Sequence, residues 1–395
     1  MFTKAFIPYG GYYSSPFIRW QGSIANVHSL PLGAATAKRW LGEKGIDAGV
    51  IDYVNFGCTI AQPRVFYAGP WAAALIGAEN VPGIWISQAC STSTSAIYQA
   101  AMAVEVGSVG TVFNLMADRC SNGPHTVWAN ANGPGGQVDQ ENWVMDNFAS
   151  DPWAGEAMAA TAENVAAMSG VTREECDAVA LRRYEQYLDA LADDRAFQKR
   201  YMFPLEVQVS KKKSVVVDAD EGIFPTTAEG LAGLKPVMPG GTHTFGAQTH
   251  PADGNAAVIV TTRDKAKEMS PDGPEVQVLA YGFSRVGKAL MPSAPVPASE
   301  AALAAAGLSI GDMAAIKTHN PFAANDLYMA KTMGLDVMSF NNYGSPLVFG
   351  HPQGPTAARC VIELIEELAL AGGGYGLFAG CAAGDTGAAL VIKVG

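Results

Sequence analysis

Apolar and polar positions alternate in short blocks over the first 118 residues of the chain. Residues 29–45 place apolar side chains at helical spacing, whereas the apolar runs within residues 50–60 and 111–117 have the length of buried strands. Residues 84–104 begin with an apolar run, break into small and polar residues, and then resume apolar positions at helical spacing. They predict a strand, a sharp turn and a helix. This alternation of strands and helices is typical of an α/β fold.

The character of the chain changes between residues 119 and 250. Gly, Asn, Pro and Trp are frequent in residues 119–137, and a charged stretch with helical spacing follows at residues 172–194. We predict an insertion that forms a lid-like subdomain, after which strands and helices resume. The expected division is residues 1–118 and 251–272 for the N-terminal half, 119–250 for the inserted loop domain, and 273–395 for the C-terminal half.

A repeat relates the two ends of the chain. The unit around Cys90 has a counterpart in residues 341–392, where a turn again precedes small residues, a helix and a strand. The second turn carries His351 and is followed by a helix predicted to begin near Thr356. A duplicated fold would bring two equivalent turns together across a pseudo-twofold axis. Cys90 and His351 are therefore expected at one site.

Composition and charge narrow the class of protein. With 395 residues, 49% hydrophobic and 16% charged, the chain is expected to form two domains or one duplicated architecture. The net charge of −11 argues against nucleic-acid binding, and the only basic run is residues 211–213. The six cysteines lack C-x-x-C spacing, which predicts neither a disulfide framework nor a zinc site and fits a reducing cytoplasm. No apolar stretch approaches the ~20 residues that span a bilayer, so we expect a cytoplasmic protein without a membrane partner.

Cys90 is the first candidate for chemistry. The predicted turn places its thiol at the start of a helix, where free N–H groups and the positive end of the dipole favour the nucleophilic thiolate. The competing interpretation is that Cys90 is a small buried hydrophobe, which is the usual environment of a free cysteine.

Short motifs follow one another along the whole chain. They are "QACSTSTSAI", "MAATAENVAAMSGVTREECDAVALRRYEQ", "DADEGIFPTTAEGLAGLKPV", "THTFGAQTHPADGNAAVIV", "THNPFA", "NNYGSPLVFGHPQGPTAAR" and "FAGCAAGDTGAALVI". In this order and at this spacing they resemble the first-cysteine, loop-domain, Asn-Glu-Ala-Phe, Gly-His-Pro and second-cysteine segments of the thiolases. Thiolases are acyltransferases that make or cleave 3-oxoacyl-CoA thioesters.

The resemblance implies a five-layered αβαβα thiolase fold, with a mixed sheet in each half and a loop domain inserted in the first. It implies an acyl-CoA substrate, coenzyme A as co-substrate, no metal or redox cofactor, and a homodimer or homotetramer. Cys90 becomes the acylated nucleophile, His351 activates it and donates to the thioester oxygen, and Cys381 shuttles the α proton. His319 joins His351 at one oxyanion site, and backbone N–H groups at Cys90 and near Ala383 form the other.

The same resemblance implies where coenzyme A binds. The residues that fall in or near the expected CoA-binding segments are His243, Gly246, Thr249 and Phe322.

Some positions depart from the family pattern. His319 stands where most thiolases have Asn, as in the sterol-carrier-type branch, which has His-Asp there, and Asn320 replaces the acidic neighbour of both patterns. Ser93 replaces a glycine shortly after the nucleophile, and residues 381–385 read Cys-Ala-Ala-Gly-Asp in place of Cys-x-Gly-Gly-Gly. Side chains therefore occupy places that the family leaves open, and we predict a pocket of different shape.

Two aromatic clusters and two cations bear on the substrate. The clusters lie in residues 9–22 and 127–148, and Arg19 and Arg64 are placed to face a carboxylate or a CoA phosphate. We interpret the aromatic clusters as walls for a bulky or aromatic acyl group, such as an arylacyl-succinyl-CoA ester. The competing interpretation puts them in the core or in subunit contacts.

Two other classes of protein stay open. Cys90, His319 and His351 also form the Cys-His-His set of a decarboxylating ketoacyl synthase, although Cys381 and the inserted segment favour a thiolase. A non-catalytic thiolase-like subunit is expected to lack these residues. Some thiolase-like proteins of this branch work with a small zinc-ribbon and OB-fold protein, which is a candidate partner.

Overall fold

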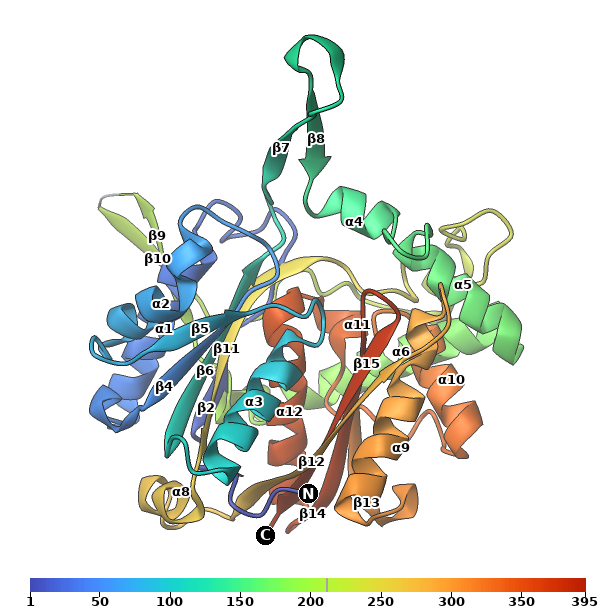
Figure 1. Ribbon diagram of the computed structural model, residues 1–395. Helices are drawn as coiled ribbons and strands as arrows, with labels where there is room; N and C mark the ends of the chain where they lie inside the picture. The colour runs from blue at the N-terminus through green and yellow to red at the C-terminus, as the bar shows by residue number, and fades with distance from the viewer. Residues whose placement is uncertain (211) are drawn as a thin grey trace.

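Two α/β halves of similar construction meet at a central layer of helices (Figure 1). The computed structural model describes residues 1–210 and 212–395, so Lys211 of the basic run lies outside the described residues. The N-terminal half comprises β1 (Phe6–Ile7), β2 (Tyr12–Ser14), β3 (Ile18–Arg19), α1 (Ser29–Glu43), β4 (Tyr53–Gly57), α2 (Ala68–Ile76), β5 (Gly83–Ile86), α3 (Thr92–Glu105), β6 (Thr111–Arg119), β11 (Ala252–Thr261) and α8 (Arg263–Met269). The C-terminal half comprises β12 (Val276–Arg285), α9 (Pro295–Ala306), β13 (Met313–His319), α10 (Ala323–Met333), α11 (Pro346–Phe349), α12 (Gln353–Leu370), β14 (Gly374–Ala382) and β15 (Thr386–Val394).

The segment between β6 and β11 adds a hairpin and several helices. Its elements are β7 (His125–Ala129), β8 (Val138–Asn142), α4 (Met145–Ala149), α5 (Met158–Ser169), α6 (Arg173–Arg195), β9 (Leu205–Ser210), β10 (Lys213–Val217) and α7 (Ala228–Ala232). The β7–β8 hairpin projects away from the two halves (Figure 1), and α5 and α6 pack against α10. Among the described helices, none is both long and apolar enough to cross a bilayer.

The two sheets repeat one strand pattern. β4 and β6 are parallel, as are β13 and β14, while β6 pairs antiparallel with β11 and β14 with β15. β1 hydrogen-bonds to both β11 and β12 and so joins the two sheets. α1 and α2 cover the outer face of the first sheet, α9 covers the outer face of the second with α10 beside it, and α3 and α12 pack together between the sheets (Figure 1). The predicted α/β class and the five-layered order are confirmed.

Local patterns predicted the elements well, except at their ends. The strand, turn and helix expected in residues 84–104 are β5, the Cys90 turn and α3. The helix expected to begin near Thr356 begins at Gln353, because Gly354 and Pro355 occupy its first turn, where no N–H is needed for an intrahelical bond.

α12 lies in the middle layer and is buried along most of its length. Two of its fully buried charged side chains form ion pairs: Arg359 donates to the Asp220 carboxylate at 2.7 and 2.8 Å, and Glu363 accepts from Lys317 at 2.7 Å. Buried charges persist only when they are paired and hydrogen-bonded in this way. The pair with Asp220 holds α12, the helix that follows His351, against the inserted segment, and the pair with Lys317 holds it against β13.

Candidate active site

Cys90 occupies a tight turn between β5 and α3. The preceding Ala89 adopts a φ of +43°, which residues with a Cβ rarely occupy. The Thr92 hydroxyl donates to the carbonyl of Ala89 (2.7 Å) and accepts from the N–H of Gln88 (2.9 Å), which ties the turn. The turn holds Cys90 at the wall of a cavity.

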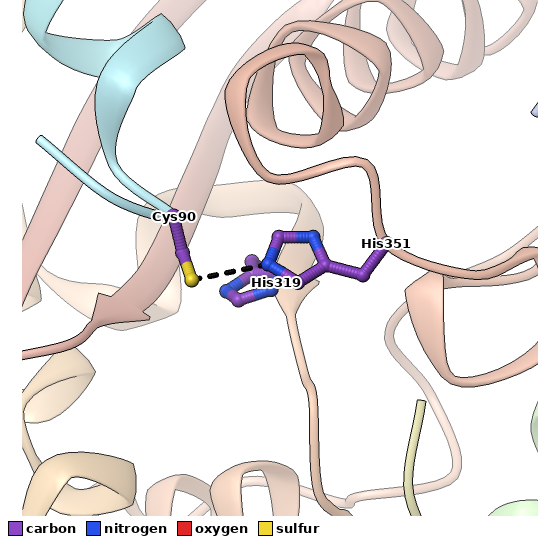
Figure 2. Close-up of side chains that lie close together, drawn as sticks. All are labelled: Cys90, His319 and His351. Atoms are coloured by element: carbon purple, nitrogen blue, oxygen red, sulfur yellow. Dashed lines mark hydrogen bonds between the residues drawn. The ribbon is translucent and has the colours of Figure 1, made fainter. Parts of the chain in front are cut away.

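His351 reaches the same cavity from the turn before α12. Gly350 has a φ of +85°, and a Cβ there would lie 2.7 Å from His250 Nε2 and 2.9 Å from Ala252 Cβ, so only glycine fits. The His351 N–H donates to the carbonyl of His250 at 2.9 Å. These contacts bring His351 Nε2 to 3.0 Å from Cys90 Sγ (Figure 2). The two turns expected to meet are therefore in contact.

The hydrogen bonds of His351 determine its tautomer. The Thr356 hydroxyl donates its single proton to the carbonyl of Pro352 at 2.5 Å. It must therefore accept at its 2.7 Å contact with His351 Nδ1, so Nδ1 carries the ring proton. Nε2 is left with a lone pair that faces the Cys90 thiol. The arrangement suits proton transfer from Cys90 Sγ to His351 Nε2.

Burial decides the protonation of this pair. It raises the pKa of the Cys90 thiol to about 12, although the N–H groups of Ala383 and of Cys90 itself lower it. Burial and the neighbouring His319 hold the pKa of His351 well below its usual range. The resting pair is a thiol and a neutral imidazole. The N–H groups near the helix start favour the thiolate as expected, but desolvation outweighs them.

His319 lies at the end of β13 beside His351, with ring centroids 4.2 Å apart (Figure 2). Its Nδ1 donates to the carbonyl of Cys381 at 3.2 Å. Its Nε2 is buried and has no hydrogen-bond partner among the residues that the structure describes. Burial lowers the pKa of His319 to about 4, so the ring is neutral and Nε2 can only accept.

Cys381 is buried near the end of β14, where Asn325 holds its sulfur. Asn325 Oδ1 accepts from the N–H of Phe322 at 3.2 Å, so its Nδ2 is the atom that donates to Cys381 Sγ at 3.2 Å. Burial raises the pKa of Cys381 above its usual value, and this donated hydrogen bond lowers it. Sequence reasoning did not find Asn325, although it lies only three residues beyond the "HNPF" segment.

A buried carboxylate joins the segment that follows β4 to the start of α12, the helix that follows His351. Asp118, at the end of β6, accepts from the Thr59 N–H (2.9 Å) and from the Gly354 N–H (2.6 Å). A Cβ at Gly354 would lie 2.7 Å from the Asp118 carboxylate. Ser93 donates to the Gly354 carbonyl, so the residue that replaces a family glycine links α3 to α12.

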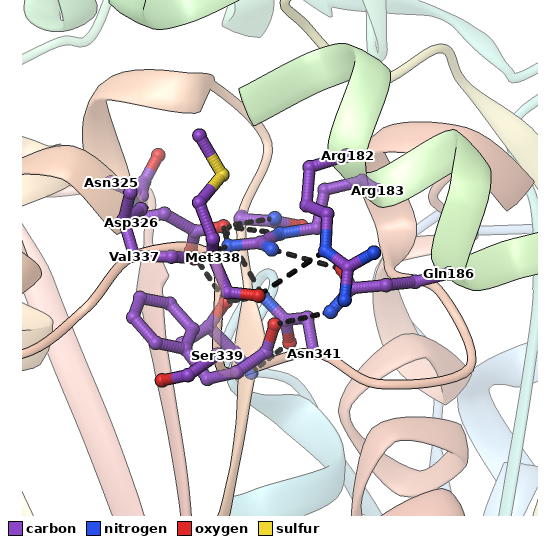
Figure 3. A network of polar contacts seen from close by, with 12 residues as sticks. Arg182, Arg183, Gln186, Asn325, Asp326, Val337, Met338, Ser339 and Asn341 are labelled. Carbon is purple, nitrogen blue, oxygen red and sulfur yellow. Dashed lines mark hydrogen bonds and ion pairs between the residues drawn. The ribbon is translucent and has the colours of Figure 1, made fainter. Parts of the chain in front are cut away.

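The Asn320 departure has a local explanation. Asn320 Nδ2 donates at 2.7 Å to the Asp326 carboxylate, which also receives Arg183 at 2.9 Å and Thr318 at 2.6 Å. Figure 3 shows Arg183 and Asn341 converging on Asp326. A carboxylate at position 320 would face this buried acid and repel it. The amide provides a donor instead.

Asp385, which stands where the family pattern has glycine, holds a loop that contributes to the wall of the cavity. Asp385 adopts a φ of +58°, and its carboxylate accepts the N–H groups of Ala289 and Leu290 at 2.9 and 3.0 Å. These contacts hold the loop that leads into Met291, a cavity residue.

The cavity in front of Cys90 has a volume of about 500 Å³. Cys90, His351 and Ala383 line it together with apolar side chains. The larger apolar residues in its wall are Ile60, Trp143, Val144, Phe148, Met158, Met291 and Phe322. Trp143 and Phe148 belong to the second aromatic cluster, whereas Tyr12, Tyr13 and Phe17 of the first are core residues.

The residues expected to bind coenzyme A are placed differently from one another. Thr249 and Phe322 line the cavity. His243 is buried away from it: its N–H donates to Glu163 at 2.9 Å, and its Nε2 accepts from the Ala324 N–H at 3.3 Å. Gly246 packs so closely that a Cβ would lie 2.3 Å from Leu231. Their assignment to CoA stays a prediction.

Arg19 and Arg64 are exposed and do not line the cavity. Their proposed contact with a carboxylate or a CoA phosphate therefore gains no support from the cavity lining.

A cysteine thiol 3.0 Å from an imidazole lone pair, where the two halves of the fold meet, is the arrangement that covalent acyl transfer on a cysteine uses. Residues 11–264 match the thiolase N-terminal domain, and residues 273–394 match the thiolase C-terminal domain. The chain belongs to the thiolase family.

Named relatives cover nearly the whole chain. It is 31% identical to the acetyl-CoA acetyltransferase of Escherichia coli (strain K12), over 94% of this chain and 95% of that protein. The crystal structure of the Bacillus anthracis acetyl-CoA acetyltransferase matches with a TM-score of 0.91 and 29% identity, over 100% of this chain and 99% of that one. The crystal structure of human mitochondrial 3-ketoacyl-CoA thiolase in complex with CoA matches with a TM-score of 0.89 and 27% identity. The match covers 99% of this chain and 98% of the human chain.

Thr356→Val is expected to lower the kcat of acyl transfer by at least about 10-fold, because a group that orients a catalytic imidazole is worth up to ~10⁴-fold. The matched variant Thr356→Ser keeps the hydroxyl and should retain most of the activity. Steady-state kinetics of both variants, with circular dichroism to confirm folding, measure the effect. Equal activity in a folded valine variant would show that Thr356 does not orient His351.

Proposed function

We propose that the protein is a thiolase that cleaves, or in reverse forms, a 3-oxoacyl-CoA through an acyl-enzyme on Cys90. The observation that carries the proposal is the 3.0 Å contact between Cys90 Sγ and the lone pair of His351 Nε2. Coenzyme A is the proposed co-substrate, and the CoA complex of the human relative supports it.

In the proposed first step, His351 Nε2 takes the Cys90 proton as Sγ attacks the 3-oxo carbon. The bond between the α and β carbons then breaks, which leaves the acyl group on Cys90. The N–H groups of Cys90 and Ala383 are the proposed donors to the developing oxyanion, and their lowering of the Cys90 thiol pKa supports this role. Each such donor is typically worth about 3 to 4 kcal/mol.

Cys381 is the proposed acid and base for the leaving half. Its thiol gives a proton to the α carbon of the departing enolate, and the resulting thiolate later takes the proton of the CoA thiol that attacks the acyl-enzyme. Asn325 stabilises the thiolate between these steps, because its Nδ2 donates to Cys381 Sγ.

His319 is proposed to act through a water molecule. Because its Nδ1 donates to Cys381 O, its Nε2 can accept one proton of a water that donates the other to the thioester oxygen. His351 completes this second oxyanion site. Because His319 stands where that branch has His, we propose that the chain is most similar to the sterol-carrier-type branch, with "HNPF" as a variant of the branch's pattern.

We further propose a bulky or aromatic acyl group, such as an arylacyl-succinyl-CoA ester. Trp143 and Phe148 in the cavity wall support this substrate class. Trp143 is held in place by the bond from its Nε1 to the carbonyl of Thr59 at 3.0 Å.

A panel of 3-oxoacyl-CoA esters with short, branched and aryl chains tests the function and the substrate class. Aryl esters are expected to have the highest kcat/KM, and Trp143→Ala should lower that value by about 10-fold or more while changing the acetoacetyl value less. Trp128→Ala is the matched control, because Trp128 is 53% exposed on the β7 strand and does not line the cavity. A preference for acetoacetyl-CoA would contradict the aromatic substrate.

The same panel separates the other candidate classes. Decarboxylation of a malonyl thioester without thiolysis would favour the ketoacyl-synthase alternative. Complete inactivity would favour a non-catalytic thiolase-like subunit.

A homodimer or homotetramer stays part of the proposal. β5 is an edge strand of the described sheet, and its Ile84 and Trp85 are 36% and 40% exposed. A second copy of the chain can pair along an exposed apolar edge strand. Light scattering of the purified chain measures the number of copies in the assembly. A small zinc-ribbon and OB-fold partner, a cytoplasmic location and the absence of a metal or redox cofactor stay predictions.

A further inference from the structure

The side chains around Cys90 form a potential set of metal ligands. Cys90 Sγ and one ring nitrogen each from His319 and His351 all lie within 4.8 Å of one another. Figure 2 shows the three side chains converging from separate segments. Cysteine sulfur and histidine nitrogen are ligand types that Zn²⁺ prefers, and three protein ligands with one open position are the arrangement of its catalytic sites.

The hydrogen bonds leave the required lone pairs free. His351 Nδ1 is engaged by Thr356, and His319 Nδ1 is engaged by the Cys381 carbonyl, so each ring offers Nε2. Metal-binding histidines are commonly oriented in this way by a bond from the other ring nitrogen. His319 Nε2 is buried, and no described residue hydrogen-bonds to it. This is a costly state for a polar atom unless a ligand or water satisfies it.

The geometry allows a tetrahedral ion with one open position. Bonds of about 2.3 Å to sulfur and about 2.0 Å to nitrogen place the sulfur and nitrogen about 3.5 Å apart. The 3.0 Å contact between Cys90 Sγ and His351 Nε2 would open by about half an ångström, which a small side-chain rotation achieves. The cavity beside these residues leaves room for water or a substrate thiol as the fourth ligand.

We propose that Cys90, His319 and His351 bind one Zn²⁺ ion and that the bound ion prevents acylation of Cys90. Binding releases the Cys90 thiol proton to solvent and involves no change of oxidation state. The inhibitory part of the proposal rests on the proposed function, whereas the binding part does not. Thiolases that resemble this chain but have Asn at the position of His319 would lack the third ligand.

Titration of the purified chain against a chromophoric zinc chelator tests the binding. One equivalent of Zn²⁺ is expected to bind. His319→Asn is expected to weaken the affinity by more than about 100-fold, because even partners that only orient a ligand are worth about 10- to 100-fold. His125→Asn, on the exposed β7 strand, is the matched control and should bind as the unaltered chain does.

Co²⁺ serves as the spectroscopic probe of the same site. The unaltered chain is expected to show a thiolate-to-Co²⁺ charge-transfer band with tetrahedral d–d absorption, and both should be lost in Cys90→Ser. Zn²⁺ should also protect Cys90 from alkylation in the unaltered chain and not in His319→Asn, as peptide mass spectrometry measures. Because Cys90→Ser and His319→Asn remove different ligands, a folding defect in one leaves the other as a test.

The outcomes separate this inference from the proposed function. Undiminished zinc affinity in folded His319→Asn, or a Co²⁺ complex without a thiolate band, would overturn the metal site. Thiolysis that is insensitive to bound Zn²⁺ would overturn the inhibition. If Zn²⁺ binds through the three residues and no 3-oxoacyl-CoA ester is cleaved, the metal site stands and the proposed function fails.

Discussion

Cys90→Ala is expected to abolish acyl-enzyme formation and to lower the kcat of thiolysis by at least about 10⁴-fold, since removal of a covalent nucleophile typically costs about that much or more. The reason is that, among the described residues, Cys90 has the only thiol that forms a hydrogen bond with His351 Nε2. Whole-protein mass spectrometry after incubation with acyl-CoA and 3-oxoacyl-CoA esters measures the acyl group directly. The mass increment should be present on the unaltered chain and absent from the variant.

The chain contains a close control for this experiment. Cys176 Sγ lies 3.7 Å from His243 Nε2, which makes a second cysteine–histidine contact, but neither residue lines the cavity. Cys176→Ala should therefore acylate normally. If no ester labels the unaltered chain, the acyl-enzyme mechanism is wrong and the non-catalytic alternative gains weight.

Cys381→Ala is expected to separate the two halves of the reaction. Exchange of the α protons of acetyl-CoA with deuterated solvent should fall by about 10³-fold or more, because a positioned acid–base group contributes typically 10²- to 10⁴-fold. Transfer of an acyl group from acyl-CoA to Cys90 should persist, because Cys90 and His351 are unchanged. NMR of the exchange and mass spectrometry of the acyl-enzyme measure the two steps on one sample.

A substitution at Asn325 tests the role of Cys381 without removing its thiol. Asn325→Asp replaces the amide donor to Cys381 Sγ with a carboxylate that repels the thiolate, so the same exchange step should slow by about 10-fold or more. Cys360→Ala removes a buried thiol that contacts Thr318 O and not the cavity, and it should leave exchange intact. Loss of both acylation and exchange in folded Cys381→Ala would contradict the separate role of Cys381.

The local pattern of the chain was enough to predict the turns that carry chemistry. The break between β5 and α3 located the Cys90 turn, and the repeated unit located the His351 turn. Such elements are encoded locally, because strand and helix periodicities are properties of neighbouring residues. The repeat also predicted that the two turns meet, and they lie 3.0 Å apart at Sγ and Nε2.

Contacts between distant residues were beyond this reasoning. Asn325 lies 56 residues from Cys381, and Asp118 lies 236 residues from Gly354, so no short motif links either pair. The aromatic clusters illustrate the same limit, because composition does not separate Trp143 in the cavity wall from Tyr13 in the core. Only the packing of the two halves assigns each ring to its place.

The sequence by itself determined the α/β class, the duplicated order of elements and the residue types available for acyl transfer. The tertiary structure alone decided the protonation of the site, because burial keeps Cys90 a thiol and Thr356 directs the His351 lone pair toward it. Desolvation depends on every layer that covers a group, and a tautomer depends on partners brought from other segments. Neither quantity is a property of the residues nearby in the chain.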